Sequence, residues 1–397
     1  MNILMLCTYP IQEPKHGGQL RVRNIADAYT AAGHKVQVHG VLGSTQYEAQ
    51  SGFLPCPTQD HLVSIMGNPF LMEDYAIGHL FAYNDKHFNQ LAAVISMRPE
   101  CIHVEQPWLF AFAQRYMATH NIKAHLIYGS QNTESQLKKD IVASYMGDEV
   151  AQQHAQRIET LEHQAITQAD TVVCVSESDQ AWAQARTKRP ILLAPNGVKP
   201  WQSQAAGQKE ARRLTQGHRY ALYCASAHPP NMKGFFDIFG GGFGSLKPDE
   251  KLVIAGGAGF AIAGDVNVHK SPKLAEKICM AGFVSQPCLE GLLDQAACIV
   301  LPLTQGGGTN LKTAEALWSG RHIVATTIAM RGFEHFMNAK GVQVADEPAE
   351  FKRALRKAMS AEPIQLSPYE QDQRRTVLWE HCLSTLVQHV NQIGLQK

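Results

Sequence analysis

Short apolar segments alternate with amphipathic ones along most of the chain, and this alternation constrains the fold more than any other feature. The apolar stretches Ile3–Cys7 and Val36–His39 flank Leu20–Ala32, which has helical periodicity and is followed by Gly33, a residue that commonly ends a helix. Strand, helix and strand in this order predict a βαβ unit. Repetition of such units predicts an α/β fold with a parallel sheet covered by helices on both faces.

The chain has 397 residues, which is more than a single hydrophobic core usually supports, so two domains are expected. Polar residues 200–217 show no strand pattern and are interpreted as the linker. We therefore predict a first domain at residues 1–199, a second at 200–374, and a C-terminal helix at about 375–397 that packs back on the first domain. The region 43–83 has no clear pattern. The clearest expected elements are strands at Cys101–Val104, His125–Tyr128, Thr171–Val175, Ile191–Ala194, Tyr220–Ala225, Lys251–Ala255, Ile278–Gly282, Cys298–Leu303, Ile323–Thr326 and Val342–Val344, and helices at Asp85–Ser96, Asp148–Gln168, Ser178–Lys188 and Gln371–Ile393.

Charge and cysteine usage exclude several classes of protein. The formal net charge is +1, which argues against nucleic-acid binding through bulk positive charge. The nine cysteines are scattered and none forms a CxxC pair, so neither a disulfide framework nor a zinc site is expected, and a cytoplasmic location fits best. Clustered metal ligands and Asp-x-Asp are also missing from the sequence, so no metal site is expected. The longest apolar runs are too short for a membrane helix, which leaves peripheral membrane contact as the alternative.

The strongest chemical signal is the segment from Cys298 to Gly320, in which an apolar strand leads through a Gly-rich loop into a helix. Glycines let a backbone approach a ligand closely, and the N-terminus of the following helix attracts phosphate. Thr309 and Asn310 stand at the expected cap, and Glu315 lies about a turn and a half into the helix. A carboxylate there is placed to accept hydrogen bonds from ribose hydroxyls. The segment therefore indicates a phosphate-and-ribose site, with a solvated helix cap as the alternative.

The residues GGGTNLKTAEALWSGRHIVAT resemble the donor-site motif of group 1 (family 4) retaining glycosyltransferases of the GT-B fold. TYPIQEPKHGGQLRVRNIADAYTAAGHKV resembles the first βαβ unit of that family, and KLVIAGGAG and MAGFVSQPCLEGLLDQAACIVLPL resemble the strands that lead to its donor site. The resemblance implies two Rossmann-like domains and transfer of a sugar from a nucleotide diphosphate sugar, UDP- or GDP-linked, to an acceptor hydroxyl. It implies no further cofactor. The acceptor would be a glycan, a lipid-linked molecule or a protein.

The resemblance also implies roles for individual residues. Glu315 would hold the ribose hydroxyls, and Phe283 with Val284 would flank the nucleobase. Gly17 and Gly18 would let the first domain approach the donor. The donor diphosphate would be bound by the loop and helix start at Gly308, Thr309, Asn310, Leu311 and Lys312.

The sequence departs from the family pattern at two places. Many relatives carry a first glutamate about two helical turns before Glu315 that contacts the transferred sugar, and Gly307 stands there in this chain. Many relatives also carry an Arg and a Lys after the first strand of the second domain. Lys233 fits the lysine position and is expected to be catalytic, whereas His228 is nearest the arginine position; Lys312 is a candidate for the missing charge.

Polar clusters follow two strands of the first domain, where an acceptor is expected to dock. His103 or Glu105 would orient an acceptor hydroxyl, and His103 is the third expected catalytic residue beside Lys233 and Glu315; the alternative is that they bond neighbouring loops. Gln131 or Asn132 stands where relatives often have a His. The aromatic stretch from Trp108 to Met117 is interpreted as helix core, with contact to a lipid-linked acceptor or membrane as the alternative. Arg21–Arg23 either faces the cleft or begins a solvated helix face.

By the resemblance the transfer retains the anomeric configuration, and attack on the front face of the sugar would let the leaving phosphate itself help to deprotonate the acceptor. Positive charge aimed at that phosphate lowers the barrier, so the transfer is expected to need no metal. Two alternatives remain, a sugar-nucleotide epimerase on the same fold and a non-catalytic protein that binds nucleotide sugars.

Overall fold

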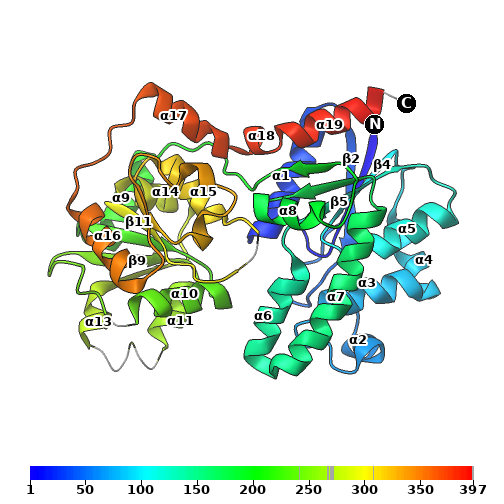
Figure 1. Cartoon of the computed structure of the whole chain (residues 1–397), viewed down its shortest axis with the longest axis horizontal. Helices are drawn as coiled ribbons and strands as arrows, with labels where there is room; N and C mark the ends of the chain where they lie inside the picture. Colours follow the sequence, from blue (N-terminus) through cyan, green and yellow to red (C-terminus); the bar gives the residue numbers. More distant parts are fainter. Residues whose placement is uncertain (241, 266–267, 269–271, 307, 396–397) are drawn as a thin grey trace. The chain divides into compact units, whose positions relative to one another are not determined.

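The computed structural model of the chain describes all residues except 241, 266–267, 269–271, 307 and 396–397, and divides into two compact units (Figure 1). Unit 1 consists of Met1–Pro195 and Leu383–Lys397, and unit 2 of Asn196–Cys382. The sequence placed the first division at residues 199–200 and the start of the returning helix at about 375. The expected pair of Rossmann-like parallel sheets is confirmed.

Unit 1 is built on a seven-stranded sheet in the order β3-β2-β1-β4-β5-β6-β7, in which every pair of neighbours is parallel. Its strands are β1 (Asn2–Cys7), β2 (Lys35–Val41), β3 (Phe53–Leu54), β4 (Cys101–Glu105), β5 (His125–Ser130), β6 (Thr171–Cys174) and β7 (Ile191–Leu193). Its helices are α1 (Gly17–Ala31), α2 (Gln59–Met66), α3 (Glu73–Tyr83), α4 (Asp85–Val94), α5 (Phe110–Thr119), α6 (Glu134–Met146), α7 (Asp148–Gln168), α8 (Glu177–Gln184) and α19 (Ser384–Leu395).

Unit 2 is built on a six-stranded parallel sheet in the order β10-β9-β8-β11-β12-β13. Its strands are β8 (Tyr220–Cys224), β9 (Lys251–Ala255), β10 (Ile278–Gly282), β11 (Cys298–Leu301), β12 (His322–Ala325) and β13 (Val342–Val344). Its helices are α9 (Ala205–Thr215), α10 (Pro229–Phe239), α11 (Ala258–Ala263), α13 (Pro272–Lys277), α14 (Gln286–Gln295), α15 (Leu311–Ser319), α16 (Pro348–Ser360), α17 (Pro368–Arg374) and α18 (Trp379–Cys382), with short 3-10 turns at Ile328–Met330, Glu334–Phe336 and Arg375–Val377.

The strand order locates a ligand site in each unit. In a doubly wound sheet, ligands bind beyond the carboxyl ends of the two strands where the order reverses. These strands are β1 and β4 in unit 1, and β8 and β11 in unit 2. Segments singled out from the sequence lie at the ends of all four of these strands.

Two expectations about connecting segments are wrong. Residues 200–217 are not a plain linker, because they contain α9. This helix packs on α14 so closely that a Cβ on Gly207 would lie 2.0 Å from the Pro287 carbonyl oxygen. The expected long helix over 371–393 is broken into α17, a 3-10 turn, α18 and α19. The break occurs where the backbone of Val198 bonds both Val377 and Trp379, so pairing with a distant segment overrides the helical periodicity.

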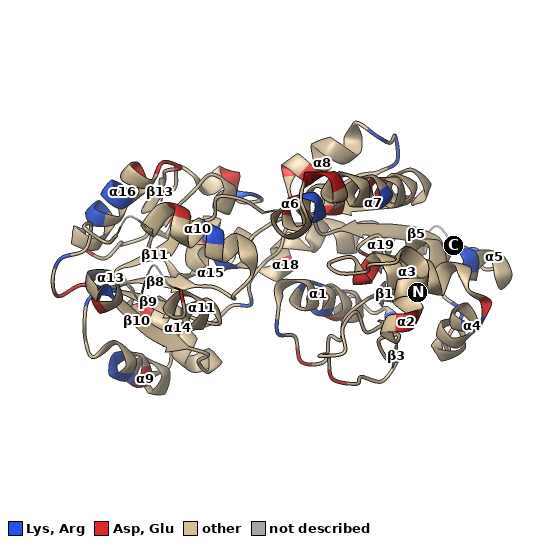
Figure 2. Cartoon of the chain, turned by 90° about the horizontal axis from the view of Figure 1, so that it is seen from below, with Lys and Arg blue, Asp and Glu red and all other residues tan. Residues whose placement is uncertain are grey.

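α19 belongs to unit 1 and forms polar contacts with two of its segments. His34 Nε2 lies 2.8 Å from Asn391 Oδ1, and Thr171 Oγ1 lies 2.8 Å from His389 Nε2. The aromatic stretch that follows β4 is core, as interpreted from the sequence, since Trp108, Phe110 and Phe112 are at most 1% exposed. Basic and acidic residues are interspersed over the helices of each unit (Figure 2). None of the helices in the described part of the chain has the length and apolarity needed to cross a membrane.

Candidate functional site

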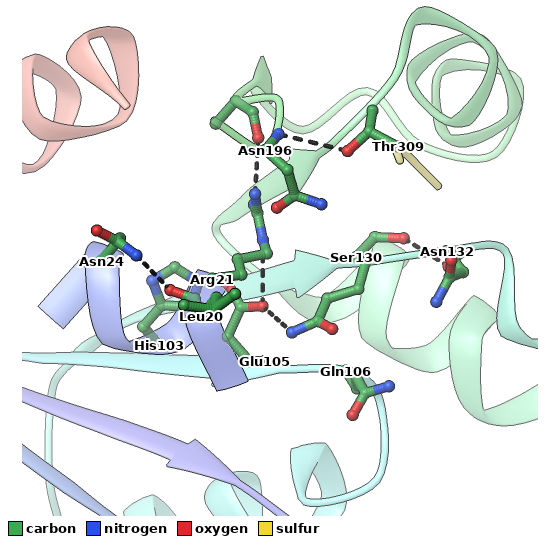
Figure 3. A network of polar contacts seen from close by, with 12 residues as sticks. Leu20, Arg21, Asn24, His103, Glu105, Gln106, Ser130, Asn132, Asn196 and Thr309 are labelled. Carbon is green, nitrogen blue, oxygen red and sulfur yellow. Dashed lines mark hydrogen bonds and ion pairs between the residues drawn. The ribbon is translucent and has the colours of Figure 1, made fainter. Parts of the chain in front are cut away.

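Two described glycines in the loop after β11 of unit 2 have positive φ. Gly306 and Gly308 have φ of 131° and 60°, a region that side chains other than glycine rarely adopt. Asn310 is the N-cap of α15, and its side chain accepts a hydrogen bond from the backbone N–H of Lys312 at 3.1 Å. Thr309 Oγ1 accepts a hydrogen bond from the backbone N–H of Asn196 at 3.4 Å (Figure 3). Gly307, where relatives carry a glutamate, lies outside the described residues.

Glu315 and Lys312 form an ion pair on the first turns of α15. Lys312 Nζ lies 3.0 Å from Glu315 Oε2, and the two side chains are 33% and 20% exposed. Burial opposes the charge of Lys312, but Cys224 and Glu315 outweigh it and raise the pKa of the ammonium. Burial also raises the pKa of the Cys224 thiol at the end of β8, an effect that the nearby Lys312 opposes. The carboxylate and ammonium thus lie at the reversal point of the sheet, where a nucleotide is expected.

Lys233 lies on α10 and is held by a neighbouring carboxylate. Its Nζ lies 2.7 Å from Asp237 Oδ2, one helical turn further on, and the side chain is 53% exposed. Thr304 Oγ1, in the loop after β11, donates to the same Asp237 oxygen at 2.5 Å. Burial alone would raise the pKa of Asp237, but its bonds to Lys233 and Thr304 lower it. Lys233 is therefore tied to the predicted donor loop through Asp237. His228 is the exposed N-cap residue of α10.

Arg331 is a cation that the sequence did not reveal as a site residue. A Cβ built on Gly306 would lie 3.6 Å from its guanidinium nitrogen Nη2, so the arginine stands beside the Gly-rich loop. Arg331 follows β12 and the turn Ile328–Met330, far from the motif in the chain. The parallel pairing of β11 with β12 brings the ends of these two segments to the same edge of the sheet.

Phe283 is the most exposed aromatic side chain of unit 2 among the described residues, at 81%. It follows β10, and its ring centroid lies 5.7 Å from that of Phe260. Gly257 stands next to the ring, because a Cβ there would lie 3.4 Å from Phe283 Cζ. The ring therefore offers an open flat face beside the carboxyl ends of β9 and β10, while Val284 packs partly against the core.

A buried polar network lies at the reversal point of unit 1 (Figure 3). Arg21 from α1 and Glu105 from β4 are both 0% exposed in their side chains, with Arg21 Nε 3.4 Å from Glu105 Oε2. Arg21 also donates to the Ala194 carbonyl at 2.8 Å. His103 Nε2 lies 3.0 Å from Glu105 Oε1, and its Nδ1 lies 2.9 Å from the hydroxyl of Tyr29. Burial alone would raise the pKa of Glu105, but Arg21 and His103 hold it below its usual value.

These contacts help to decide whether His103 and Glu105 orient an acceptor hydroxyl or bond neighbouring loops. A side chain with no exposed surface and with neighbours on both sides does not reach an acceptor hydroxyl in this conformation. The structure thus favours the alternative in which His103 and Glu105 bond neighbouring segments. Arg21 likewise points into unit 1, while Arg23, two residues later, pairs with Asp27 on a half-exposed face.

Gln131 and Tyr9 form the outer side of this network. Gln131 Nε2 donates to Glu105 Oε2 at 2.6 Å and to the Tyr9 hydroxyl at 2.5 Å. A Cβ on Gly18 would lie 2.9 Å from the Tyr9 hydroxyl oxygen and 3.1 Å from Gln131 Oε1. Gly17 and Gly18 begin α1, so the two glycines, Tyr9 and Gln131 gather where β1 and β4 end. Tyr9 was not predicted, because a tyrosine after a first strand carries no distinguishing pattern.

Over the described ranges, groups of three or more His, Cys, Asp or Glu residues with metal-ligating geometry are not found.

Two family models match the chain. A model described as a glycosyl transferase 4-like domain matches residues 16–197, and one described as glycosyl transferases group 1 matches residues 219–361. No curated protein matches the sequence significantly.

Several solved structures share the two-unit fold. Sucrose-phosphate synthase from Thermosynechococcus elongatus is 13% identical with a TM-score of 0.71 over 100% of both chains. HepE from Anabaena, in complex with UDP and glucose, is 13% identical with a TM-score of 0.65 over 99% of this chain and 100% of that one. The catalytic domain of starch synthase IV from Arabidopsis thaliana, bound to ADP and acarbose, is 10% identical with a TM-score of 0.63 over 99% of this chain and 98% of that one. At such identities the likeness concerns the fold.

Proposed function

Because the chain belongs to the group 1 glycosyltransferases, enzymes that transfer sugars on a GT-B fold, we propose that it uses a nucleotide diphosphate sugar as donor and an acceptor hydroxyl as recipient. We further propose that the transfer retains the anomeric configuration and needs no metal ion. The observation that carries the proposal is the arrangement of Gly306, Gly308, Lys312 and Glu315 at the reversal point of the unit 2 sheet.

The donor diphosphate is proposed to bind at the start of α15. Backbone N–H groups and the positive end of a helix attract phosphate, and the positive-φ glycines keep side chains away from it. Glu315 lies on the same helix and is one-fifth exposed, which leaves its carboxylate accessible to ribose hydroxyls. Two of the similar solved structures have UDP and ADP bound, and this supports a nucleoside diphosphate as the ligand of such a site.

The nucleobase is proposed to lie against Phe283. A ring that is 81% exposed in a folded unit leaves a large apolar face in water, and stacking with a base would cover it. The base is taken as uracil or guanine, in line with a UDP- or GDP-sugar.

Metal-independent transfer requires protein cations near the leaving diphosphate. Lys312, Lys233 and Arg331 all lie within or beside the loop after β11. Positive groups fixed before the reaction stabilise the charge that develops on the leaving phosphate, and this stabilisation is often the largest contribution to catalysis. In the retaining mechanism that the family implies, the same phosphate takes the acceptor proton. No carboxylate base is then needed, which agrees with the buried position of Glu105.

The proposal is tested by calorimetry with UDP-, GDP- and ADP-glucose, after a thermal-shift screen has identified the nucleotide that stabilises the protein. Replacing Glu315 with alanine removes two hydrogen bonds to a charged acceptor, of about 1.5–3 kcal/mol each, so affinity should fall about 100-fold or more. Glu350→Ala is the matched control, because Glu350 is an exposed helical carboxylate in unit 2 with 60% of its side chain accessible.

Unchanged affinity in Glu315→Ala would contradict the ribose assignment. Product analysis with the wild-type chain then separates the remaining classes: a glycosylated acceptor supports transfer, an epimerised sugar indicates an epimerase, and binding without any turnover indicates a non-catalytic protein.

A further inference from the structure

A groove on unit 1 is lined by residues of α3, α5 and α7 and lies outside the polar network at the reversal point. It encloses about 370 Å³, which falls within the roughly 300–1,000 Å³ of small-molecule sites. Trp108 lines it and follows the carboxyl end of β4 by three residues. α3 packs directly on this loop, since a Cβ on Gly78 would lie 2.1 Å from the Trp108 carbonyl oxygen. The groove therefore adjoins the strand end at which an acceptor is expected.

One wall of the groove is aromatic. Tyr75, His79 and Tyr83 are spaced by four residues on α3 and so lie on one face of the helix. Ring centroids are 6.4 Å apart for Tyr75 and His79, and 4.7 Å apart for His79 and Tyr83. Tyr83 is 62% exposed, and burial lowers the pKa of His79, so its ring is uncharged at neutral pH. The wall thus presents three aromatic rings to the groove.

The opposite wall is polar. Arg157, Thr160 and Gln164 lie on one face of α7 and line the groove. Among the described residues that line it, none carries a carboxylate, and Arg157 has no ion pair within 4.0 Å in the described part of the chain. The buried indole Nε1–H of Trp108 has no hydrogen-bond acceptor among the described groups. Thr160 Oγ1 donates to the Gln156 carbonyl oxygen at 2.9 Å, and Gln164 Nε2 donates to Gln114 Oε1 at 2.7 Å. The groove therefore combines flat apolar rings with a guanidinium that the described protein groups do not pair.

These features match a sugar chain. A pyranose ring has an apolar face of C–H groups, which packs on aromatic rings, and a rim of hydroxyls, which bond guanidinium, hydroxyl and amide groups. A lipid tail would cover the guanidinium of Arg157 without pairing it, which is unfavourable. We propose that the groove binds the non-reacting end of an oligosaccharide acceptor. The proposal rests on the proposed function, because it assigns the acceptor of the same transfer reaction to the class of oligosaccharides.

The test measures oligosaccharide binding to the full-length chain by calorimetry without donor. The probes are neutral gluco- and galacto-oligosaccharides and a hexuronate series, each from mono- to hexasaccharide. At least one series should bind more tightly as it lengthens, and Tyr83→Ala should weaken the longest member about three- to tenfold. Arg157→Ala should also weaken it, most strongly for hexuronates if the acceptor is acidic. Tyr369→Ala is the matched control, because Tyr369 is a 72% exposed tyrosine of unit 2, and it should leave binding unchanged.

Three results would overturn the inference: no binding by any series at millimolar concentration, equal binding by wild type and Tyr83→Ala, or loss of binding to anionic phospholipid vesicles in Tyr83→Ala with oligosaccharide binding intact. The last result would identify the groove as a membrane contact. Because donor affinity is measured separately, failure of the donor assays would reject the proposed function whatever the groove binds. In all three variants, donor affinity should equal that of wild type.

Discussion

Separating Arg21 from Glu105 tests whether the unit 1 network is structural. Their closest nitrogen and oxygen are 3.4 Å apart, and neither side chain has exposed surface. Removing one member of such a pair leaves an uncompensated buried charge, which costs about 3–5 kcal/mol. Glu105→Gln keeps the shape of the side chain and removes the charge, so unit 1 should lose stability by about that amount. Arg21→Met should cost slightly less, since Glu105 can then take up a proton.

The informative quantity is the coupling between the two substitutions. With both charges removed, the double variant should be far more stable than the sum of the single effects predicts, by about 3 kcal/mol. Because the chain has two compact units, a single global unfolding curve mixes them. Hydrogen exchange of the amides of β4, followed by mass spectrometry, reports the opening of unit 1 alone.

A coupling energy below about 1 kcal/mol would refute this reasoning, because that is the value of a solvent-screened pair. It would mean that water enters the network, and His103 would again be a candidate for contact with the acceptor. Gln136→Ala serves as the control, since Gln136 bonds Asp140 on an exposed face of α6 and lies outside the network.

Two further substitutions address catalysis and stability. Lys233→Ala should lower kcat about tenfold or more and change nucleotide affinity little, because the diphosphate gains charge mainly in the transition state. Steady-state kinetics would measure kcat and calorimetry the affinity, and full turnover by the variant would show that Lys233 takes no part in catalysis. Glu162 accepts hydrogen bonds from the backbone N–H groups of Glu134 and Ser135, yet burial raises its pKa to about 7. The stability that protonated Glu162 contributes is present below its unfolded pKa of about 4.3 and is lost as pH rises through 7. Glu162→Gln should therefore flatten the decline in the free energy of unfolding between about pH 5 and pH 8, by up to about 3 kcal/mol. Parallel pH profiles of wild type and variant in denaturant titrations would contradict the raised pKa.

The fold follows from the sequence where each element carries its own periodicity. β4, β5 and α7 were predictable because their apolar residues repeat locally. The region 43–83 was not, because β3 pairs through only two residues with β2, and α3 carries apolar residues on most of its faces. The end of the predicted helix over 371–393 depends on Val198, nearly two hundred residues earlier, and no local pattern records that pairing.

The residues of the candidate site can likewise be divided into those that the sequence predicted and those that it did not. Glu315, Lys312 and Asn310 were found because they lie on one contiguous strand–loop–helix segment, in which spacing alone fixes their neighbours. Arg331 and Tyr9 were missed because each reaches its site through sheet pairing with another segment. His103 was predicted as a catalytic residue from its place at a strand end, but the side chains of Tyr29 and Glu105 enclose it. A strand-end position therefore identifies the edge of the sheet, while burial decides which side chains can meet a substrate.

Two candidate cations of unit 2 already form ion pairs with carboxylates. The strength of each ion pair determines whether the lysine is available to bind the diphosphate of a nucleotide. Lys233 is about half exposed, so its pair with Asp237 contributes at most about 1 kcal/mol, and a diphosphate would readily compete for it. Lys312 is less exposed, and its pair with Glu315 is held within one helix. If ribose hydroxyls bind Glu315, they donate to the carboxylate without removing its charge, so Lys312 stays positive and in place beside the diphosphate. If the proposed donor site is correct, donor binding would open the pair of Lys233 with Asp237, whereas the pair of Lys312 with Glu315 would stay closed and bind both the diphosphate and the ribose.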